Sequence, residues 1–288
     1  MRKERVWQED QFWQDSRGIK RNSLLNRHLN RIKLEILDHG YFIGDEQWNQ
    51  FDVMSPFGRV YYMIADDGWL ETTTGRLDLI PGHMYLIPPY AQVNLRTSSR
   101  IEKFYFHFSL KYAGIEVLEG INQCLTLSLD DAFLKRIVEI FEGGEMTDLL
   151  MFKSLAYDSL ARFIRSGLPE LERRIELTDS YKDVFTYIEE HLSARLSGKD
   201  VCEALGYAYE TMRRRFRNDN GITFNQYING RLIQAAAMRL LLSDLTIQQI
   251  AAELGFTDEF YFSRVFKKKM EYSPREYRRI NAAIRNPS

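Results

Sequence analysis

The sequence has little of what marks an exported, membrane-spanning or disulfide-stapled protein. Its 288 residues include two cysteines, Cys124 and Cys202, which lie far apart and predict neither a disulfide framework nor a metal clip. No apolar run approaches the roughly 20 residues that a membrane span requires. The N-terminus, MRKERVWQEDQFWQD, mixes charges with aromatic residues and does not resemble a secretory signal. We therefore expect a soluble, cytoplasmic protein without a membrane partner.

The formal net charge of −1 hides a difference between the two ends of the chain. From Lys182 onward there are 17 Lys and Arg residues against 13 Asp and Glu residues, which leaves 22 against 27 before it. A basic C-terminal third on an acidic body is typical of a protein with a nucleic-acid-binding module.

The first half of the chain is rich in short β-branched or aromatic segments that are separated by Gly and Pro. These segments are RVYYMIA (59–65), WLETTT (69–74), RLDLI (76–80), HMYLI (83–87) and IEKFYFHF (101–108). Their spacing predicts an antiparallel sandwich or barrel. From residue 129 apolar residues recur every three or four positions, which predicts two amphipathic helices. The charged stretch GLPELERRIELTDS (167–180) is the expected linker between two domains.

The last third of the chain has helix-start signals at four places, each with a reciprocal partner three residues later. The pairs are Ser197 with Asp200, Thr223 with Gln226, Thr246 with Gln249, and Ser273 (before Pro274) with Glu276.

An internal repeat dominates this region. The segment VCEALGYAYETMRRRFRNDNGITFNQYI (201–228) aligns with IAAELGFTDEFYFSRVFKKKMEYSPREYRR (250–279). In each copy a short helix ends at Gly206 or Gly255, which can adopt the left-handed conformation of a turn, and a second helix follows. We expect apolar side chains of each second helix to face the core: Met212 and Phe216 in copy one, Phe262 and Phe266 in copy two.

The repeat is therefore a helix-turn-helix that occurs twice. The intervening FNQYINGRLIQAAAMRLLL (224–242) predicts one long connecting helix, because it is rich in Ala and Leu. Such a helix can hold two recognition helices about one DNA turn, or roughly 34 Å, apart.

This arrangement resembles the DNA-binding domain of AraC/XylS-type transcriptional regulators, on the strength of RLIQAAAMRLLL followed by IAAELGFTDEFYFSRVFKKKMEYSPREYRR. The segments RVYYMIA and LIPGHMYLIPPYAQV are similar to the cupin-like domain of the AraC branch. The resemblance implies an α+β protein of two domains, in which a cupin-like antiparallel β-barrel with C-terminal helices precedes an all-α double helix-turn-helix domain. The implied boundaries are an effector-binding and dimerisation domain at 1–166 (barrel 45–128, helices 130–166), the linker at 167–180, and a DNA-binding domain at 181–288 with helix-turn-helix units at 197–220 and 246–270.

The sequence departs from the family pattern at three positions. Ala208 stands where a Ser-like cap is usual, and Arg215 stands where a core residue is expected. Arg215 either leaves the first unit less firmly packed or reaches a phosphate. Glu271 replaces a Gly that the first copy retains as Gly221, which predicts a strained or altered turn.

Exposed polar residues of the two second helices are the candidates for DNA contact. For base edges these are Glu210, Arg213, Arg214, Glu259, Phe260, Ser263 and Arg264, and for phosphates Arg217, Lys267, Lys268 and Lys269. A solvated charged helix face is the alternative for the charged residues, and packing on the connecting helix is the alternative for Phe260. Arg214 and Arg264 occupy equivalent positions, so a shared structural task competes with base reading. The denser arginine cluster predicts that copy one supplies more of the base specificity.

In the strand 101–108, Lys103, Tyr105 and His107 alternate with three Phe residues. The Phe face is expected to pack on the helices of 130–165, and the polar face to line the barrel. That lining suits a hydroxyl-rich ligand such as a sugar, and the resemblance implies the same role for Lys103 and Tyr105. A mixed, satisfied core is the alternative. Arg59, Trp69 and Tyr85 are further candidates for the effector pocket.

Two enzyme classes are disfavoured. The five histidines, His28, His39, His83, His107 and His191, contain no His-x-His pair, whereas a metal-dependent cupin enzyme needs clustered ligands. Neither cysteine has the proline-cysteine-histidine context of a repair methyltransferase. We expect no enzymatic activity, metal or cofactor; the expected partners are operator DNA, a second copy in a homodimer, RNA polymerase and a small molecule. The alternative is a regulator whose N-terminal domain only dimerises or binds a protein.

Overall fold

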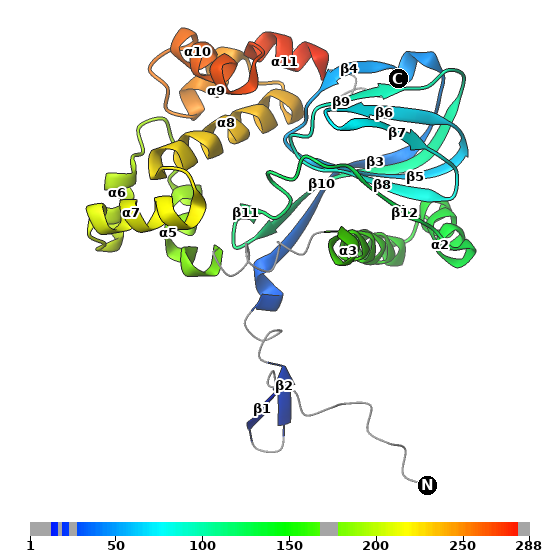
Figure 1. Cartoon of the computed structure of the whole chain (residues 1–288), viewed down its shortest axis with the longest axis horizontal. Helices are drawn as coiled ribbons and strands as arrows, with labels where there is room; N and C mark the ends of the chain where they lie inside the picture. The colour runs from blue at the N-terminus through cyan, green and yellow to red at the C-terminus, as the bar shows by residue number, and fades with distance from the viewer. Residues whose placement is uncertain (1–12, 17–18, 23–27, 168–177, 282–288) are drawn as a thin grey trace.

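The computed structural model describes residues 13–16, 19–22, 28–167 and 178–281. In the N-terminal half, the strands form two facing antiparallel sheets (Figure 1). The larger sheet contains β11 (Ile115–Glu116), β10 (Ile101–Tyr112), β5 (Gly58–Asp66), β8 (His83–Ile87) and β12 (Leu125–Ser128), with β3 (Ile32–Gly44) also paired to β10. The smaller sheet contains β4 (Gln50–Val53), β9 (Val93–Arg96), β6 (Gly68–Thr72) and β7 (Gly75–Leu79). A separate hairpin joins β1 (Trp13–Ser16) to β2 (Ile19–Asn22), and short 3-10 helices lie at η1 (Leu29–Arg31) and η2 (Glu46–Trp48).

The antiparallel architecture agrees with the expectation, but the described strands form two sheets and do not close into one barrel. The sheets also begin earlier than residue 45, because β3 pairs with the full length of β10. The alternation of Ile32, Leu34 and Ile36 with charged residues is the period-2 signal of this strand.

The two faces of β10 divide as predicted. Phe104, Phe106 and Phe108 lie in a core with α2 (Asp131–Glu142) and α3 (Met146–Gly167), whereas Tyr105 lies in a second core between the two sheets. This half of the protein is thus a helix layer, a larger sheet and a smaller sheet. The cluster of candidate effector residues lies between the sheets.

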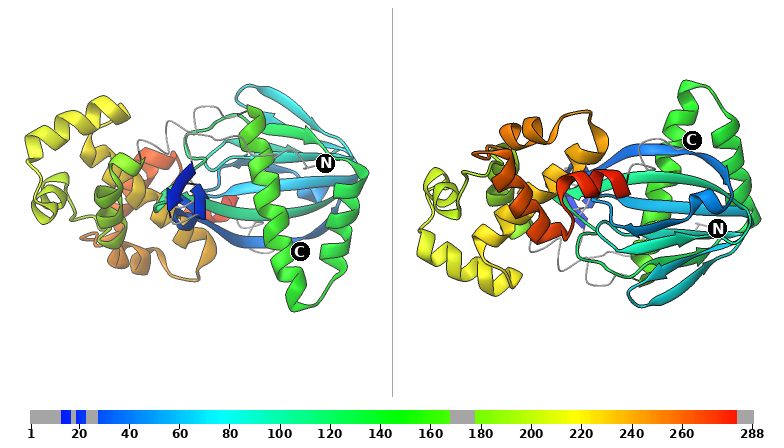
Figure 2. Two further views of the ribbon diagram at one scale, coloured as in Figure 1. Left: turned by 90° about the horizontal axis from the view of Figure 1, so that it is seen from below. Right: turned by 90° about the horizontal axis from the view of Figure 1, so that it is seen from above.

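The C-terminal half is helical: α5 (Lys182–Glu190), α6 (Gly198–Leu205), α7 (Tyr209–Asn220), α8 (Phe224–Leu242), α9 (Ile247–Glu253), α10 (Glu259–Met270) and α11 (Pro274–Ile280). All four predicted capping pairs form reciprocal capping boxes, which start α6, α8, α9 and α11. One helix-turn-helix unit, α6–α7, and the other, α9–α10, lie on either side of α8 (Figure 1). All of these helices lie to one side of the two sheets (Figure 2). Most of the expected linker, residues 168–177, lies outside the described residues. No helix in the described part of the chain is long and apolar enough to cross a membrane.

The second unit packs on the N-terminal half, where α11 lies beside β4 (Figure 1). Phe57, from the loop between β4 and β5, is 1% exposed and belongs to the core of α8, α9, α10 and α11. The Tyr277 hydroxyl donates a hydrogen bond of 2.7 Å to the Met54 carbonyl. On α8, the buried Arg231 pairs with Glu189 at 2.7 Å and lies 3.8 Å from Glu119 of the N-terminal half.

Candidate nucleic-acid interface and effector site

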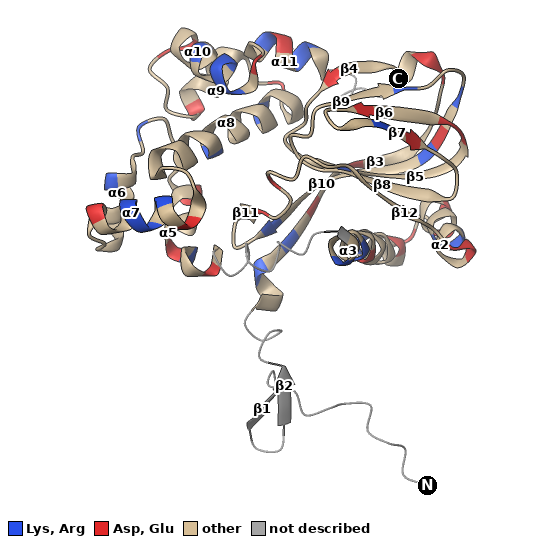
Figure 3. Ribbon diagram, viewed as in Figure 1, with Lys and Arg blue, Asp and Glu red and all other residues tan. Residues whose placement is uncertain are grey.

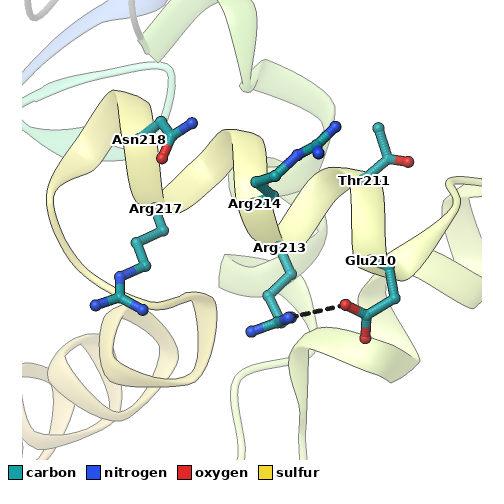
Figure 4. Close-up of a pocket in the computed structure, with 6 residues that line it drawn as sticks. All are labelled: Glu210, Thr211, Arg213, Arg214, Arg217 and Asn218. Carbon is teal, nitrogen blue, oxygen red and sulfur yellow. Dashed lines mark hydrogen bonds and ion pairs between the residues drawn. The ribbon is translucent and has the colours of Figure 1, made fainter.

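The exposed side of α7 carries two neighbouring rows of polar side chains (Figure 4). Glu210, Arg213 and Arg217 form one row, and Thr211, Arg214 and Asn218 form the other. Residues three and four apart share a helix face, which explains both rows. Phe216 lies on the opposite side, fully buried, with Met212 packed at the edge of the same core. This division of α7 into a core face and a polar face confirms the prediction.

The arginines of α7 differ in their partners. Arg213 donates to the Glu210 carboxylate from Nε at 3.1 Å and from Nη2 at 2.9 Å. In the described part of the chain, the guanidinium groups of Arg214 and Arg217 form no hydrogen bond or ion pair, and both are exposed. Arg214 and Arg217 therefore have their full donor capacity available to a ligand.

Arg215 has a structural role within the protein. Its Nε lies 3.6 Å from the Asp219 carboxylate, and its guanidinium stands 5.5 Å from the ring centre of Tyr181. The Tyr181 hydroxyl donates to the same carboxylate at 2.5 Å. Arg215 thus connects α7 to the residue that precedes α5.

In α10, Phe262 and Phe266 are buried as predicted, and the exposed face is more apolar than that of α7. Phe260 is 71% exposed, at the position equivalent to Glu210. Arg264 is exposed and lies 5.9 Å from the ring centre of Tyr261. Glu259 and Ser263 are half-buried, whereas Lys267 and Lys268 are exposed. Figure 3 shows the basic residues of α7, α10 and α11 interspersed with acidic ones.

Lys269 differs from its two neighbours in position. It lines a hollow of about 240 Å³ between the end of α10 and the N-terminal half. Met54, Thr73, Tyr90 and Gln92 supply much of the opposite wall. Lys269 therefore faces the N-terminal half, unlike the exposed Lys267 and Lys268.

The turns of the two units differ at their ends. Gly206, Gly255 and Gly221 all have positive φ angles, of 70°, 75° and 71°. Glu271 has nearly the same conformation as Gly221, with φ of 67°, although it carries a side chain. Ala208 provides no side-chain cap to α7, whereas Asp258 accepts a hydrogen bond of 2.7 Å from Tyr261 N and caps α10.

The candidate effector residues Arg59, Tyr85, Lys103, Tyr105 and His107 lie between the two sheets and are all buried. They come from adjacent strands, since β5 pairs with both β10 and β8. Trp69 is not part of this group. Trp69 alternates with the fully buried Leu70 on β6, so its side chain faces away from the space between the sheets. There the Arg76 guanidinium lies 4.3 Å from the centre of the Trp69 ring. We correct its assignment accordingly.

Aromatic rings surround Lys103. Its Nζ lies 3.4 Å from the ring centre of Tyr61 and 4.4 Å from that of Trp48. Burial, with a smaller contribution from Arg59, holds the pKa of Lys103 well below its usual range. Burial also lowers the pKa of His107, whose ring stacks on Phe57 with centres 5.1 Å apart. The Phe57 contact is a link to the helical half that sequence patterns did not indicate.

Comparison with known proteins places the C-terminal part of the chain. A family model described as a helix-turn-helix domain matches residues 201–280. The regulatory protein SoxS of Escherichia coli is 32% identical over 97 residues, which are 34% of this chain and 91% of SoxS. The chain belongs to the AraC family of transcriptional regulators. The uncharacterised regulator YijO of Escherichia coli is 32% identical over 99 residues, and the match spans 34% of this chain but only 35% of YijO.

Among solved structures, ToxT from Vibrio cholerae is similar over 87% of this chain and 98% of its own, at 14% identity and a TM-score of 0.47. In this AraC-family chain the N-terminal antiparallel sheets are followed by the helical helix-turn-helix domain, which is the fold class that the sequence predicted.

Proposed function

We propose that the protein is a sequence-specific DNA-binding transcriptional regulator whose helices α7 and α10 enter successive major grooves. The observation that carries this proposal is the pair of exposed, unpartnered guanidinium groups of Arg214 and Arg217 on the second helix of a duplicated helix-turn-helix. A guanidinium with free donors can bind O6 and N7 of guanine in a bidentate manner or pair with a phosphate.

The proposed contacts with bases and phosphates are assigned from the surroundings of each side chain. Arg214 is the principal base reader of α7, and Arg213 contributes once the incoming base competes with Glu210 for its donors. Arg217, Lys267 and Lys268 neutralise phosphates. On α10 the base-facing set is Glu259, Phe260, Ser263 and Arg264, and the exposed ring of Phe260 suits the methyl group of thymine.

Selection of binding sites from a random duplex library, followed by affinity measurement, tests this proposal. Arg214→Ala is expected to cost about 1–3 kcal/mol and to relax the sequence preference at one position. Arg217→Ala is expected to weaken binding to all sequences and to reduce the salt slope by about one unit. Lys153→Ala, an exposed cation of α3, is the matched control and leaves both unchanged. An unaltered motif and salt slope in both arginine variants would contradict the proposal.

The N-terminal domain is proposed to bind a small effector between its two sheets, a sugar or another metabolite, and to alter how a homodimer presents its DNA-binding domains. Five buried residues from neighbouring strands, Arg59, Tyr85, Lys103, Tyr105 and His107, support this location. A thermal-shift screen of sugars and metabolites tests it, with operator affinity as the second readout. Absence of any shift in melting temperature or affinity over the whole screen would contradict effector binding.

A second function, dimerisation without an effector, is favoured by one specific observation. The outer face of α3 exposes Met146, Leu149 and Leu150, which are 76%, 58% and 69% exposed. Apolar side chains gathered in this way suit a protein interface. Leu150→Glu is expected to dissociate the dimer in analytical ultracentrifugation, and Ser98→Glu, at an exposed position in the turn after β9, is the control for one added negative charge. A dimer that survives Leu150→Glu would exclude this face.

A further inference from the structure

Three side chains that can carry positive charge lie close together inside the N-terminal domain. Arg59, Lys103 and His107 are 2%, 3% and 7% exposed. Arg59 and His107 are directly opposite one another in the pairing of β5 with β10, and Lys103 precedes His107 by four residues on the same face. All three therefore point into the space between the two sheets.

Arg59 and Lys103 lack the negative charge that buried cations normally have. In the described part of the chain, no carboxylate forms an ion pair with Arg59 or Lys103. Arg59 donates to the Ser55 hydroxyl, but its Nε is buried without a partner. His107 Nδ1 also has no hydrogen bond, and the nearest carboxylate, Asp38, stands 3.5 Å away with its side chain 35% exposed.

Burying these groups lowers the stability of the protein when no ligand is bound. A buried charge is stable when it is paired and hydrogen-bonded, and a buried donor without an acceptor forfeits its hydration. The Lys103 ammonium group lies over the faces of the Tyr61 and Trp48 rings, which attract a cation. These rings supply no oxygen or nitrogen atom to accept its N–H hydrogen bonds. The cluster is electrostatically incomplete.

We propose that this cluster is the binding site of a small organic anion, whose carboxylate or phosphate group supplies the missing negative charge to Arg59 and Lys103. The proposal rests on the proposed effector function and names its ligand class. Aromatic neighbours pack against the body of the ligand, and the free donors of Arg59 and His107 bind its acidic oxygens.

The position of the cluster is suited to an effector. The Phe57 ring stacks on His107 and lies 5.7 Å from the Arg59 guanidinium, while the same ring is a core member of α8 to α11. An anion that draws Arg59 or His107 toward itself changes the packing of Phe57. That change reaches the second helix-turn-helix unit through the packing of Phe57 in its core.

Thermal unfolding of the full chain tests the proposal with acetate and inorganic phosphate as probes, each against chloride at equal ionic strength. In chloride, Lys103→Met is expected to melt at the wild-type temperature or higher, because it removes a buried amine that no carboxylate compensates. A probe at about 100 times its dissociation constant should raise the wild-type melting temperature by roughly 5–10 °C and that of Lys103→Met by much less. The larger response of acetate or of phosphate identifies the acidic group, and Lys33→Gln, an exposed cation of β3, responds like wild type.

Three results would overturn the proposal. Lys103→Met melting several degrees lower in chloride would show that the cation–π contacts are structural and complete. Equal anion responses in wild type and Lys103→Met would place anion binding elsewhere. A neutral sugar that stabilises both proteins alike would retain the effector function and remove only its anionic character. Operator affinity is measured in parallel. A failure of the proposed DNA-binding function would appear there, whereas the three outcomes above are read from melting temperatures.

Discussion

Replacing Glu271 with glycine is expected to stabilise the second helix-turn-helix unit, because this residue ends α10 in a conformation that disfavours a side chain. Its φ of 67° is in the left-handed region, where the first copy has Gly221 with φ of 71°. Glu271 N donates to the Lys267 carbonyl at 2.8 Å, a bond that glycine retains. The substitution therefore changes the side chain and keeps the turn.

The expected magnitude is the difference between two opposing effects. A left-handed conformation costs a residue with a side chain about 1–2 kcal/mol. Glycine gives back about 0.5–1 kcal/mol through its greater freedom in the unfolded chain. The net gain for Glu271→Gly is about 1 kcal/mol, and removing a negative charge from the C-terminal end of a helix adds about 0.3 kcal/mol.

Urea unfolding followed by circular dichroism measures this gain. Glu271→Gln isolates the charge, and it should recover only the smaller part. Gly221→Ala is the reciprocal test: its added Cβ meets no atom within 4 Å, so the expected loss of about 1 kcal/mol comes from the backbone alone. Equal stability of Glu271→Gln and Glu271→Gly, or no loss in Gly221→Ala, would refute the reasoning from strain.

Three further substitutions have defined outcomes. Burial raises the pKa of Glu116 to about 7, so the folded protein binds the carboxyl proton of Glu116 more tightly than the unfolded chain does. Protonation of Glu116 therefore stabilises the fold fully below about pH 4.5, and this stabilisation is lost as the pH rises to about 7. Glu116→Gln should therefore gain up to roughly 3 kcal/mol over wild type at pH 8 and far less at pH 5 in urea unfolding; equal gains at both pH values would contradict this. Thr246→Ala removes the capping box of α9 and should cost about 1 kcal/mol, whereas an unchanged unfolding midpoint would show that the cap is redundant. Arg215→Ala should lower stability by up to about 1 kcal/mol and leave the selected DNA motif intact; an altered motif would place Arg215 at the DNA.

Local signals in the sequence predicted local structure well. The four capping boxes depend on residues three positions apart, so their side-chain chemistry is sufficient to locate helix starts. The two faces of β10 were predictable for a similar reason, since strict alternation assigns Phe106 and His107 to opposite sides whatever the rest of the sheet does.

The features that the sequence patterns did not indicate involve interactions between distant segments. Trp69 and Leu70 are both large and apolar, so alternation alone cannot say which of them faces the larger sheet. The direction of Lys269 depends on where the N-terminal half docks on α10. Phe57 follows a turn and has no periodic neighbours, and its burial among α8 to α11 arises from that docking. These positions need the tertiary fold.

The contacts of the two helix-turn-helix units give them different roles. The core of the second unit includes Phe57 and is bordered by Met54 and Tyr90 of the N-terminal half, whereas that of the first is bordered by Ile115. The proposed effector site between the sheets is therefore joined to the second unit by more packed residues than to the first. In the described part of the chain, α7 carries Arg214 and Arg217 without a hydrogen bond or ion pair beside Arg213, whereas α10 has Arg264 as its one arginine. We infer that α7 supplies most of the base specificity, and that the effector controls whether α10 adds its anchoring contacts to the same duplex.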